Sequence, residues 1–400
     1  MLDRELLRER FAMRSLLEFA RTLTPDLGPE GILKSVLRTI MGKGLITEGF
    51  AYLSLKKEEA EHRYYLVTKS GFRSLDLPHD ISFANLETWL FTPPDRTHFT
   101  LPILDSEQQE IIGFLGFGKS LSPETDIATE QNYLESLSLL TGIALTNAEL
   151  FKAERERERF EAELRLAREI QQSLLPQSLP EIKGLFFSAY SKQSELVGGD
   201  YYDIIKLSEN KSLVAIADVV GKGISAAILM ANLQASLRAM VALLRSNQIG
   251  LKQMVGDLNN LMYESTAAER YITAIFAILD SSKGTINAMV CGHPRPILYS
   301  ETGQYTELPT NGVPLGVISD YSFTVTEVEF NIASTLILYT DGLSEAVSKG
   351  HMLGVKGVEN FVRIMAAQGS TAQSIESALS NTADLTVTDD VTVVVVKRMA

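Results

Sequence analysis

The hydrophobic positions along the first 150 residues predict a unit that mixes helices and strands. Apolar residues recur at helical spacing over residues 6–23 and 29–41. Apolar runs with the composition of strands follow at 49–55, 64–68, 99–104 and 111–117. The polar stretch 105–109 separates the last two runs, so we expect them to form a hairpin, and a further helix is expected from about residue 123 through residue 145. We therefore predict helices around a central antiparallel sheet for residues 1–148.

The pattern changes abruptly between residues 149 and 179. Residues 151–170 contain no glycine or proline, and opposite charges stand four positions apart at Glu161 and Arg165. One seam at spacings of three and four carries the apolar residues Leu150, Ala153, Phe160, Leu164, Ala167 and Leu174. Arg157 and Gln171 interrupt that seam, and Pro176 and Pro180 end the helix. Two interpretations of this linker helix stay open: a solvated spacer, or a coiled-coil-like helix that pairs two copies of the chain.

Strand patterns dominate residues 180–400. They cover 186–190, 202–207, 212–217, 272–280, 285–290, 297–299, 321–330, 335–339 and 391–397. Two helical patterns interrupt them, at 224–244 and 251–263. The tight turn at 281–284 indicates that neighbouring strands run antiparallel. The expected fold class is α+β, with two antiparallel sheets in a β-sandwich flanked by helices.

Composition narrows the possible partners. Hydrophobic residues make up 45% of the 400 residues, which suits several packed domains, and the formal net charge is −13. That charge, without a long basic run, argues against nucleic acid or an anionic membrane surface as a partner. Cys291 is the single cysteine, so an internal disulfide is excluded and a reducing compartment is expected. The N-terminus has no signal-peptide pattern and no uninterrupted apolar stretch is long enough to span a bilayer, so we expect a cytoplasmic protein without membrane insertion.

Carboxylates stand at the ends of three apolar runs in the C-terminal half. Asp218 follows the run 213–217, Asp341 follows 336–339, and the pair Asp389 and Asp390 precedes the run 391–396. Each site alone has an ordinary explanation, such as a turn or a charged strand edge. Brought together by folding, they would form an oxygen-rich pocket suited to hard divalent cations. A phosphate-binding P-loop is excluded, because GKG at 221–223 lacks both the first glycine and the final serine or threonine of that motif.

Six ordered motifs connect these carboxylates. They are VGGDYYD at 197–203, DVVGKG at 218–223, GHPRP at 292–296, GVPLG at 312–316, YTDGLSEA at 339–346 and DDVT at 389–392. Together with the segment AREIQQSLLP at 167–176, this string closely resembles the SpoIIE/RsbU-type branch of the PPM (PP2C-like) serine/threonine phosphatases. The resemblance covers about residues 174–397. Helices around a central antiparallel sheet, with the last helix leaving the domain, resemble a GAF-type domain, and this family often carries sensor domains upstream. Residues 1–148 are therefore interpreted as a GAF-like α/β sensor domain, residues 149–179 as the linker helix and residues 180–400 as the phosphatase domain.

The resemblance implies a role for each matching residue. Asp218 would bridge two divalent cations, Mn²⁺ or Mg²⁺, with the backbone carbonyl of Val219 on one of them. Asp341 and Asp389 would bind the second ion, and Asp200 would lie at the first through water. Asp218, Asp341 and Asp389 would thus act in catalysis through the bound metals and an activated water. No covalent phosphoenzyme is required.

Other residues near these motifs have two possible uses. Asp203 points to the opposite strand face from Asp200, so it is either a second-shell residue or structural. Asp390 is the less favoured metal ligand of its pair, and Lys222 is either a contact to the substrate phosphate or a solvated lysine. His293 is either an acid for the leaving serine or, as its Gly-His-Pro setting favours, a residue that shapes the loop. The residue that protonates the leaving group stays unassigned.

The resemblance predicts a phosphatase acting on phosphoserine or phosphothreonine. The implied substrate is a phosphorylated STAS-type anti-sigma antagonist in a bacterial partner-switching pathway, with the sensor domain regulating turnover and the linker forming a homodimer. A catalytically inactive phosphoprotein-binding module is the alternative; a nucleotide cyclase is disfavoured, because YY replaces the EF of a GGDEF signature at 201–202. The sensor's ligand is a small molecule or a protein. His62, His79 and His98 lack metal-ligand spacing, and Trp89 and Phe91 either line a pocket or pack in the core.

Overall fold

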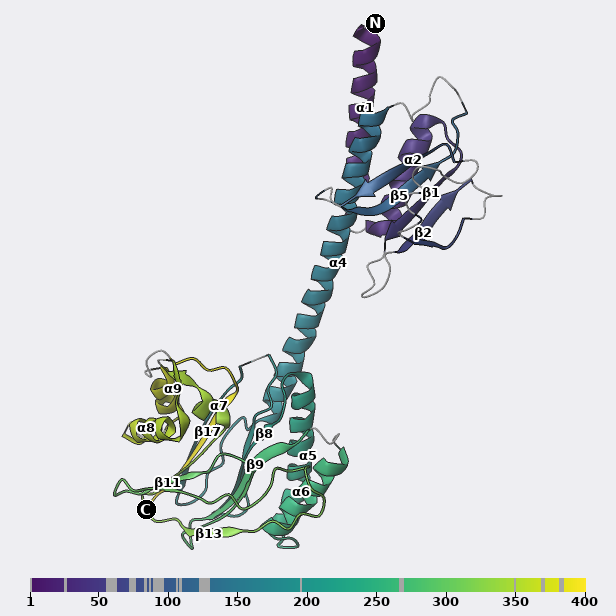
Figure 1. The fold of residues 1–400 in the computed structure, drawn as a ribbon. Coiled ribbons are helices and arrows are strands. Elements are labelled where there is room, and N and C mark those ends of the chain that lie inside the picture. The colour runs from purple at the N-terminus through teal and green to yellow at the C-terminus, as the bar shows by residue number, and fades with distance from the viewer. Residues whose placement is uncertain are drawn as a thin grey trace. The chain divides into compact units, whose positions relative to one another are not determined.

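The computed structural model of the chain describes two compact units, Met1–Arg159 and Phe160–Ala400 (Figure 1). The described residues are 2–24, 27–54, 63–71, 77–82, 85, 88, 97–105, 107, 110–121, 130–194, 196–265, 270–348, 350–367, 371–380 and 385–400. The predicted start of a helix near residue 123, His62, Trp89 and Phe91 lie outside them.

The N-terminal unit is built on a five-stranded antiparallel sheet with strand order β3-β2-β1-β5-β4. Its elements are α1 (Leu2–Thr22), α2 (Gly28–Gly44), β1 (Gly49–Ser54), β2 (Arg63–Ser70), β3 (Asp80–Ser82), β4 (Phe99–Leu104), β5 (Ile111–Phe117) and the first part of α4 (Gln131–Leu174). The three helices share one core with a single face of the sheet, through residues such as Phe19, Leu33 and Leu137. Aromatic residues, among them Tyr52 and Phe114, which stack with ring centroids 5.0 Å apart, pack on the other face. The predicted hairpin of residues 99–104 and 111–117 is confirmed as β4 and β5.

Helix α4 continues the N-terminal unit directly into the predicted linker. It runs without a break from Gln131 to Leu174, so the last helix of residues 1–148 and the linker helix are one element. Several apolar side chains beyond the N-terminal core are exposed: Leu150 (64%), Phe160 (54%), Leu166 (58%) and Ile170 (57%). Helical propensity and ion pairs such as Lys152–Glu156 support the charged stretch between them.

The C-terminal unit contains two five-stranded antiparallel sheets, as predicted. Their strand orders are β13-β10-β9-β8-β7 and β12-β11-β14-β17-β6. The first sheet comprises β7 (Tyr201–Lys206), β8 (Lys211–Val219), β9 (Ile272–Asp280), β10 (Thr285–Cys291) and β13 (Thr326–Glu329). The second comprises β6 (Leu185–Lys192), β11 (Ile297–Tyr299), β12 (Tyr305–Glu307), β14 (Thr335–Tyr339) and β17 (Val391–Arg398). Two short strands, β15 (Val347–Ser348) and β16 (His351–Met352), form a separate ribbon.

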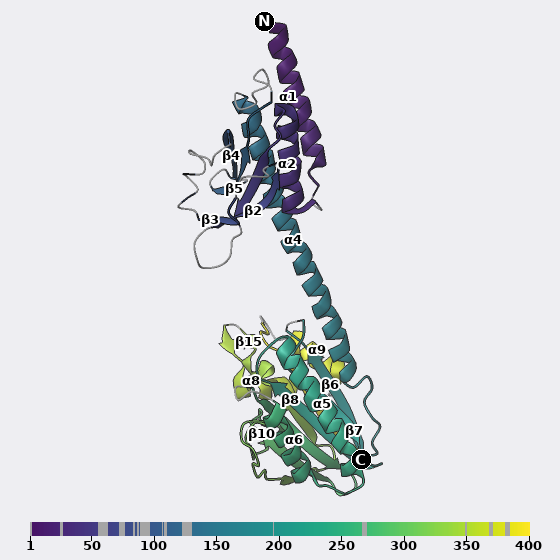
Figure 2. The same cartoon turned by 90° about the vertical axis from the view of Figure 1, so that its right-hand side faces the viewer.

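The two sheets pack face to face, and helices cover their outer faces. Side chains such as Ile216 and Ile275 from the first sheet meet Leu338 and Val394 from the second in one buried cluster. Helices α5 (Ile224–Arg245) and α6 (Leu251–Ser265) pack on the outside of the first sheet (Figure 2). Helices α8 (Gly354–Ala367) and α9 (Ala372–Ser380) pack on the outside of the second sheet. The result is the helix-flanked sandwich expected from the strand pattern.

Helix α5 is the one described helix that is long and apolar enough, by length and composition, to cross a membrane. A core helix passes the same test, and Leu233, Leu237 and Val241 of α5 are buried against the sheet. The length and composition of α5 are therefore only weak evidence for membrane insertion.

Two details of the C-terminal half differ from the sequence prediction. Helices α7 (Asp341–Glu345), α8 and α9 were not predicted, although Val358, Phe361 and Val362 of α8 fall at helical spacing and are buried. The strand predicted for residues 321–330 forms only over Thr326–Glu329. In residues 321–325, Tyr321 and Phe323 pack edge-to-face on each other and contact the hydrophobic cluster of α5 and α6 instead of extending the strand.

Candidate metal centre

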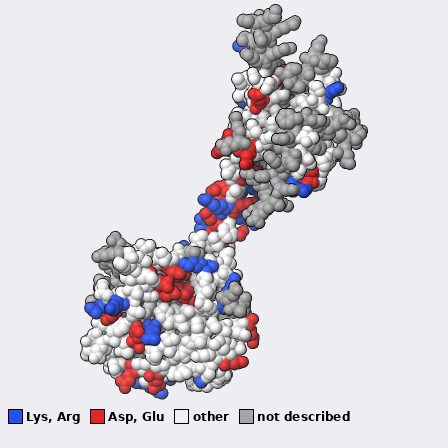
Figure 3. Space-filling model, viewed as in Figure 1, with Lys and Arg blue, Asp and Glu red and all other residues white. Residues whose placement is uncertain are grey.

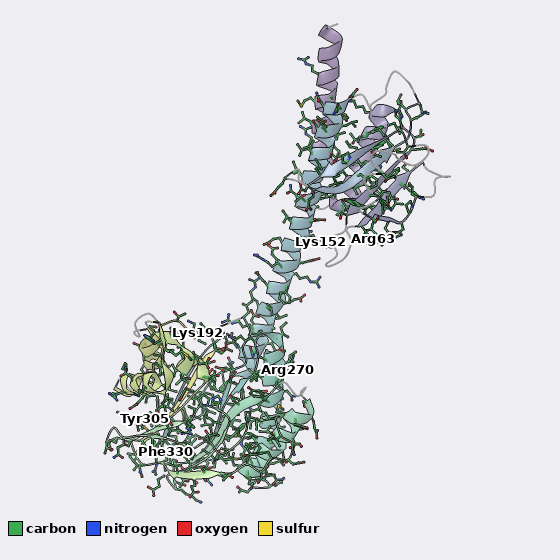
Figure 4. The ribbon with its side chains drawn as sticks, viewed as in Figure 1. Arg63, Lys152, Lys192, Arg270, Tyr305 and Phe330 are labelled. Atoms are coloured by element: carbon green, nitrogen blue, oxygen red, sulfur yellow. The ribbon has the colours of Figure 1, made fainter. Side chains whose placement is uncertain are left out.

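The end of β8 from the first sheet and the end of β14 and start of β17 from the second sheet lie at one edge of the sandwich. Lys192, paired with Val391, marks this edge in Figure 4, and Phe330 beside the β9–β10 hairpin marks the opposite one. Asp218 lies near the end of β8, opposite Thr273 of β9. Strands β14 and β17 are antiparallel, so the end of β14 lies beside the start of β17. Asp341 follows the end of β14, and Asp389 and Asp390 precede the start of β17, so all three lie at the same edge.

Asp218 is the centre of an electrostatically unfavourable group. Burial, followed by repulsion from Asp341, Asp389, Asp390 and Glu345, raises the pKa of Asp218 to about 7. Figure 3 shows acidic side chains gathered on one face of the C-terminal unit, close to where Figure 1 labels α7, with basic side chains beside them. A positive charge at this point would remove the repulsion.

Asp341 begins helix α7, which also contributes an acidic residue that the sequence analysis missed. Burial, Glu345 and Asp389, in that order, raise the pKa of Asp341. Glu345 lies four positions after Asp341 in the same short helix, so the two carboxylates share a helix face. The four-residue spacing of Asp341 and Glu345 within the YTDGLSEA motif could have identified Glu345 from the sequence.

Asp200 is held by hydroxyl groups from the second sheet. It is 2% exposed, and its Oδ2 accepts hydrogen bonds from Thr340 Oγ1 at 2.9 Å and Thr392 Oγ1 at 2.6 Å. Burial and then the nearby charge of Asp218 raise its pKa well above the usual range. Both threonines lie within the motifs YTDGLSEA and DDVT, but the spacing of these motifs does not show that the two hydroxyl groups bind Asp200.

Asp390 organises a glycine loop. Its Oδ1 accepts hydrogen bonds from the Ser194 amide at 2.8 Å and hydroxyl at 3.1 Å, and its Oδ2 accepts from the Gly199 amide at 3.0 Å. A Cβ on Gly198 would lie 2.0 Å from Asp390 Oδ2. These contacts favour the structural use of Asp390, consistent with Asp389 being the preferred ligand of the pair.

The Val219 carbonyl oxygen and Asp218 Oδ1 both lie close to Gly199. A Cβ on Gly199 would come within 2.7 Å of that carbonyl oxygen and 3.2 Å of Asp218 Oδ1, so only glycine leaves both oxygens uncovered. Two oxygen donors of the kind that hard cations prefer are thus side by side.

Lys222 lines a small pocket together with Asp218, Asp389 and Asp390. Its Nζ is 3.2 Å from Asp389 Oδ2 and donates to the Thr388 carbonyl at 3.2 Å. Gly221 and Gly223 on either side have positive φ angles of 102° and 72° and open space around them. The lysine therefore pairs with one of the predicted metal ligands.

Asp203 takes no part in this group. It is fully buried and its carboxylate receives Arg238 Nε at 2.6 Å, Arg238 Nη2 at 2.8 Å and the Tyr201 hydroxyl at 2.8 Å. Of its two possible uses, the structure supports the structural one: a bidentate ion pair that ties β7 to α5.

His293 is likewise buried. It is 4% exposed, its Nδ1 lies 2.8 Å from Thr273 Oγ1, and burial lowers its pKa to about 3. A neutral, enclosed imidazole suits the loop-shaping use better than proton donation to a substrate.

The donor set fits divalent cations in chemical type. Asp218, Asp341 and Asp389, with the Val219 carbonyl, supply only hard oxygen ligands, and the raised pKa values of Asp218 and Asp341 show that negative charge accumulates there. Within the described residues, no three acidic, histidine or cysteine side chains converge closely enough to hold an ion as they stand.

Comparisons with known proteins agree with this arrangement. Residues 208–399 match the family described as stage II sporulation protein E (SpoIIE). The phosphoserine phosphatase RsbU of Bacillus subtilis is 25% identical over 240 residues, covering 59% of this chain and 70% of RsbU. The phosphoserine phosphatase RsbP of the same organism is 27% identical over 190 residues, covering 48% of this chain and 47% of RsbP, so the chain spans about half of that relative.

A solved structure shows the same fold. The SiaA-PP2C domain of Pseudomonas aeruginosa superimposes with a TM-score of 0.52 at 18% identity, covering 61% of this chain and 99% of that domain. The match is to the fold alone. Residues 208–399 thus match the SpoIIE family, and the named relatives support a SpoIIE/RsbU-type, PP2C-like serine/threonine phosphatase domain in the C-terminal unit.

Proposed function

We propose that this protein is a metal-dependent phosphatase that hydrolyses phosphoserine or phosphothreonine on a partner protein. The observation that carries the proposal is the group of Asp218, Asp341 and Asp389 at one edge of the sandwich, where burial and then repulsion between the carboxylates raise the pKa of Asp218 to about 7. A site that concentrates carboxylates, with Lys222 as the one cation reported above beside them, is costly unless it serves a ligand.

Each residue has a part in this chemistry. Asp218, Asp341 and Asp389 would hold two divalent cations, Mn²⁺ or Mg²⁺, with the Val219 carbonyl and, through water, Asp200. Bound there, the ions would supply an activated water and neutralise charge on the phosphoryl oxygens. Lys222, half-exposed at the mouth, would meet the phosphate dianion once Asp389 releases it. The lone cysteine is buried and its pKa is raised to about 12, which fits hydrolysis without a thiolate nucleophile.

The substrate and the regulation extend the proposal. The relatives RsbU and RsbP are named phosphoserine phosphatases, and the family resemblance implies a phosphorylated STAS-type protein as substrate in a partner-switching pathway. The N-terminal unit would act as a GAF-like sensor for a small molecule or a protein and would signal through α4. The exposed Phe160, Leu166 and Ile170 of α4 support a homodimer through the linker. The proposal places the protein in the cytoplasm, with no nucleic acid and no membrane insertion.

The decisive experiment measures hydrolysis of p-nitrophenyl phosphate and of a phosphorylated STAS protein with Mn²⁺, with Mg²⁺ and with EDTA. We expect metal-dependent turnover in the wild-type chain and its loss in Asp218→Asn. Asp257→Asn is the matched control, because Asp257 is exposed on α6 and is not among the charges that raise the pKa of Asp218. Phosphoprotein binding without turnover at any metal concentration would identify the inactive binding module instead.

A further inference from the structure

Two basic side chains flank the acidic edge of the sandwich without belonging to the acidic group. Lys192 ends β6 and is paired with Val391, which directly follows Asp390. Arg270 precedes the first residue of β9 by two positions. Both residues are exposed, and Figure 4 shows both at the end of the C-terminal unit opposite Phe330. Each sheet therefore carries one cation beside the acidic edge.

Lys192 lies on the outer side of the second sheet. Residues that are paired across antiparallel strands point to the same face of the sheet, and the partner Val391 is buried in the cluster that α8 and α9 form on the outer face. Lys192 itself is exposed at the end of its strand. Among the residues that the structure describes, no carboxylate pairs with its ammonium group.

Arg270 lies on the outer side of the first sheet. The Val220 amide donates to the Tyr271 carbonyl at 3.1 Å, so β8 and β9 stay side by side up to the residue next to Arg270. Arg270 and Ile272 are two positions apart and share a face, and Ile272 is buried against α5 and α6. Its guanidinium group, too, has no ion-pair partner in the described part of the chain.

The acidic group lies between these two outer faces. Asp218 is on the same face of β8 as Ile216, which belongs to the core between the sheets. The carboxylates at this edge repel an acidic partner, and Lys222 is already paired with Asp389 at 3.2 Å. The two flanking cations are unpaired and can therefore attract such a partner and orient it over the site.

Exposed apolar side chains next to Arg270 indicate that the partner is a protein. Tyr271 is 36% exposed, and Ile224, the first residue of α5, is 46% exposed. Arginine beside exposed aromatic and aliphatic residues is typical of protein interfaces, and a small phosphate ester would not need such a surface. Stacked sheets lie about 10 Å apart and an extended chain advances about 3.3 Å per residue. Cations on the two outer faces would thus meet the second or third residue on either side of a phosphoserine bound between them.

We propose that Lys192 and Arg270 are specificity-determining residues that bind acidic side chains of the protein substrate on either side of its phosphoserine. This inference rests on the proposed function and names the chemistry of the substrate sequence that the site selects. Each contact is an exposed ion pair, so each favours an acidic over a neutral substrate by about two- to fivefold, and the two together by about tenfold. Because the preference is electrostatic, high salt reduces it.

Two serine-phosphorylated peptides measure this preference in the full chain with Mn²⁺. One carries glutamate, and the other glutamine, at the second and third positions on each side of the phosphoserine. We expect kcat/KM to be about tenfold higher for the glutamate peptide, through a lower KM, and this ratio to fall to about one in the double variant Lys192→Gln, Arg270→Gln. A ratio near one in the wild type, or an unchanged ratio in the double variant, would overturn the proposal.

A matched double variant controls for the change in net charge. Lys252→Gln with Lys283→Gln also removes two exposed cations, one on α6 and one in the β9–β10 turn beside Phe330. We expect this control to keep the wild-type ratio of the two peptides. An equal fall of the ratio in the control would show that net charge, and not Lys192 and Arg270, sets the preference.

Reversing the two charges distinguishes recognition from a change in fold. Lys192→Glu with Arg270→Glu should prefer a peptide with lysine at the same four positions over the glutamate peptide. A structural defect would lower kcat/KM for both peptides alike. A reversed variant that still prefers the glutamate peptide would contradict direct contact between these residues and the substrate.

Peptide binding, measured by fluorescence anisotropy apart from turnover, separates this inference from the proposed function. A wild-type chain that binds the glutamate peptide more tightly, but hydrolyses neither peptide nor p-nitrophenyl phosphate, would refute the phosphatase function and support the docking role. A wild-type chain that hydrolyses both peptides with equal kcat/KM and binds them equally would support the phosphatase and refute the selection of acidic substrates.

Discussion

Replacing Asp218 by asparagine should stabilise the metal-free protein while abolishing its activity. Burial and the carboxylates around Asp218 raise its pKa from 3.8 to about 7. The folded state therefore holds this proton more tightly than the unfolded chain does. In the metal-free protein, the stability associated with this proton is fully present below about pH 4 and is lost as the pH rises through about 7. Asparagine keeps the shape of the side chain and removes the charge.

The size of the effect follows from the pKa shift. A shift of about 3 units corresponds to about 4 kcal/mol at 1.36 kcal/mol per unit. Because Asp218 is partly open to solvent, which screens the repulsion, we expect about half of this, roughly 2 kcal/mol, at pH 7.5. That gain would raise the Tm of the C-terminal unit by roughly 4–8 °C.

Calorimetry of the full chain in EDTA, between pH 5 and 8, measures this gain. The difference in Tm between Asp218→Asn and wild type should grow with pH, while Asp257→Asn should follow the wild type throughout. With Mn²⁺ the order should reverse, because the wild-type carboxylates gain a ligand and the variant loses one. A metal-free Asp218→Asn protein that is no more stable than wild type at pH 7.5 would refute the repulsion on which the candidate site rests.

Three other variants test separate parts of the structure. Arg238→Met leaves Asp203 buried without its partner and should lower the free energy of unfolding by about 3 kcal/mol in urea titrations; adding Asp203→Asn should restore part of it, and no recovery would contradict the ion pair's role. Gly198→Ala, whose Cβ would lie 2.0 Å from the hydrogen-bonded Asp390, should weaken Mn²⁺ binding by about tenfold or more in calorimetric titrations, and unchanged binding would contradict the tight loop. Lys222→Gln should tighten Mn²⁺ binding by about two- to fivefold, since its half-exposed ion pair competes for one ligand; unchanged affinity would show that the pair does not compete.

Local patterns predicted much of the C-terminal fold. The runs at 335–339 and 391–397 were correctly predicted as strands, because continuous β-branched and aliphatic residues suit a strand buried on both faces. The short helix α7 was missed since five residues are too few to show helical spacing. Helix α8 was missed although its apolar residues have the right spacing, because Gly354 and Gly357 lower the helix propensity of its first turns.

The candidate site, like the fold, was predictable from the sequence only in part. The sequence by itself determined that carboxylates end the strands around 218, 341 and 389, because a strand end is visible in the apolar pattern and an aspartate beside it is visible in the composition. Alternation along β7 also predicted that Asp200 and Asp203 face opposite sides. These are short-range properties of the chain, and the aspartates that they identify are hard oxygen ligands.

Only the tertiary structure decided which of these groups act on one another. Arg238 lies 35 residues from Asp203, Thr392 lies 192 residues from Asp200, and Gln171 lies 27 residues from Gly198. Each pair is made by the packing of helices and sheets, since spacing in the sequence carries no information on which face of a helix meets which strand end. Burial then sets the energetics: the same carboxylate is an ordinary acid in the unfolded chain, and at the edge of the sandwich Asp218 becomes a group whose pKa is about 7.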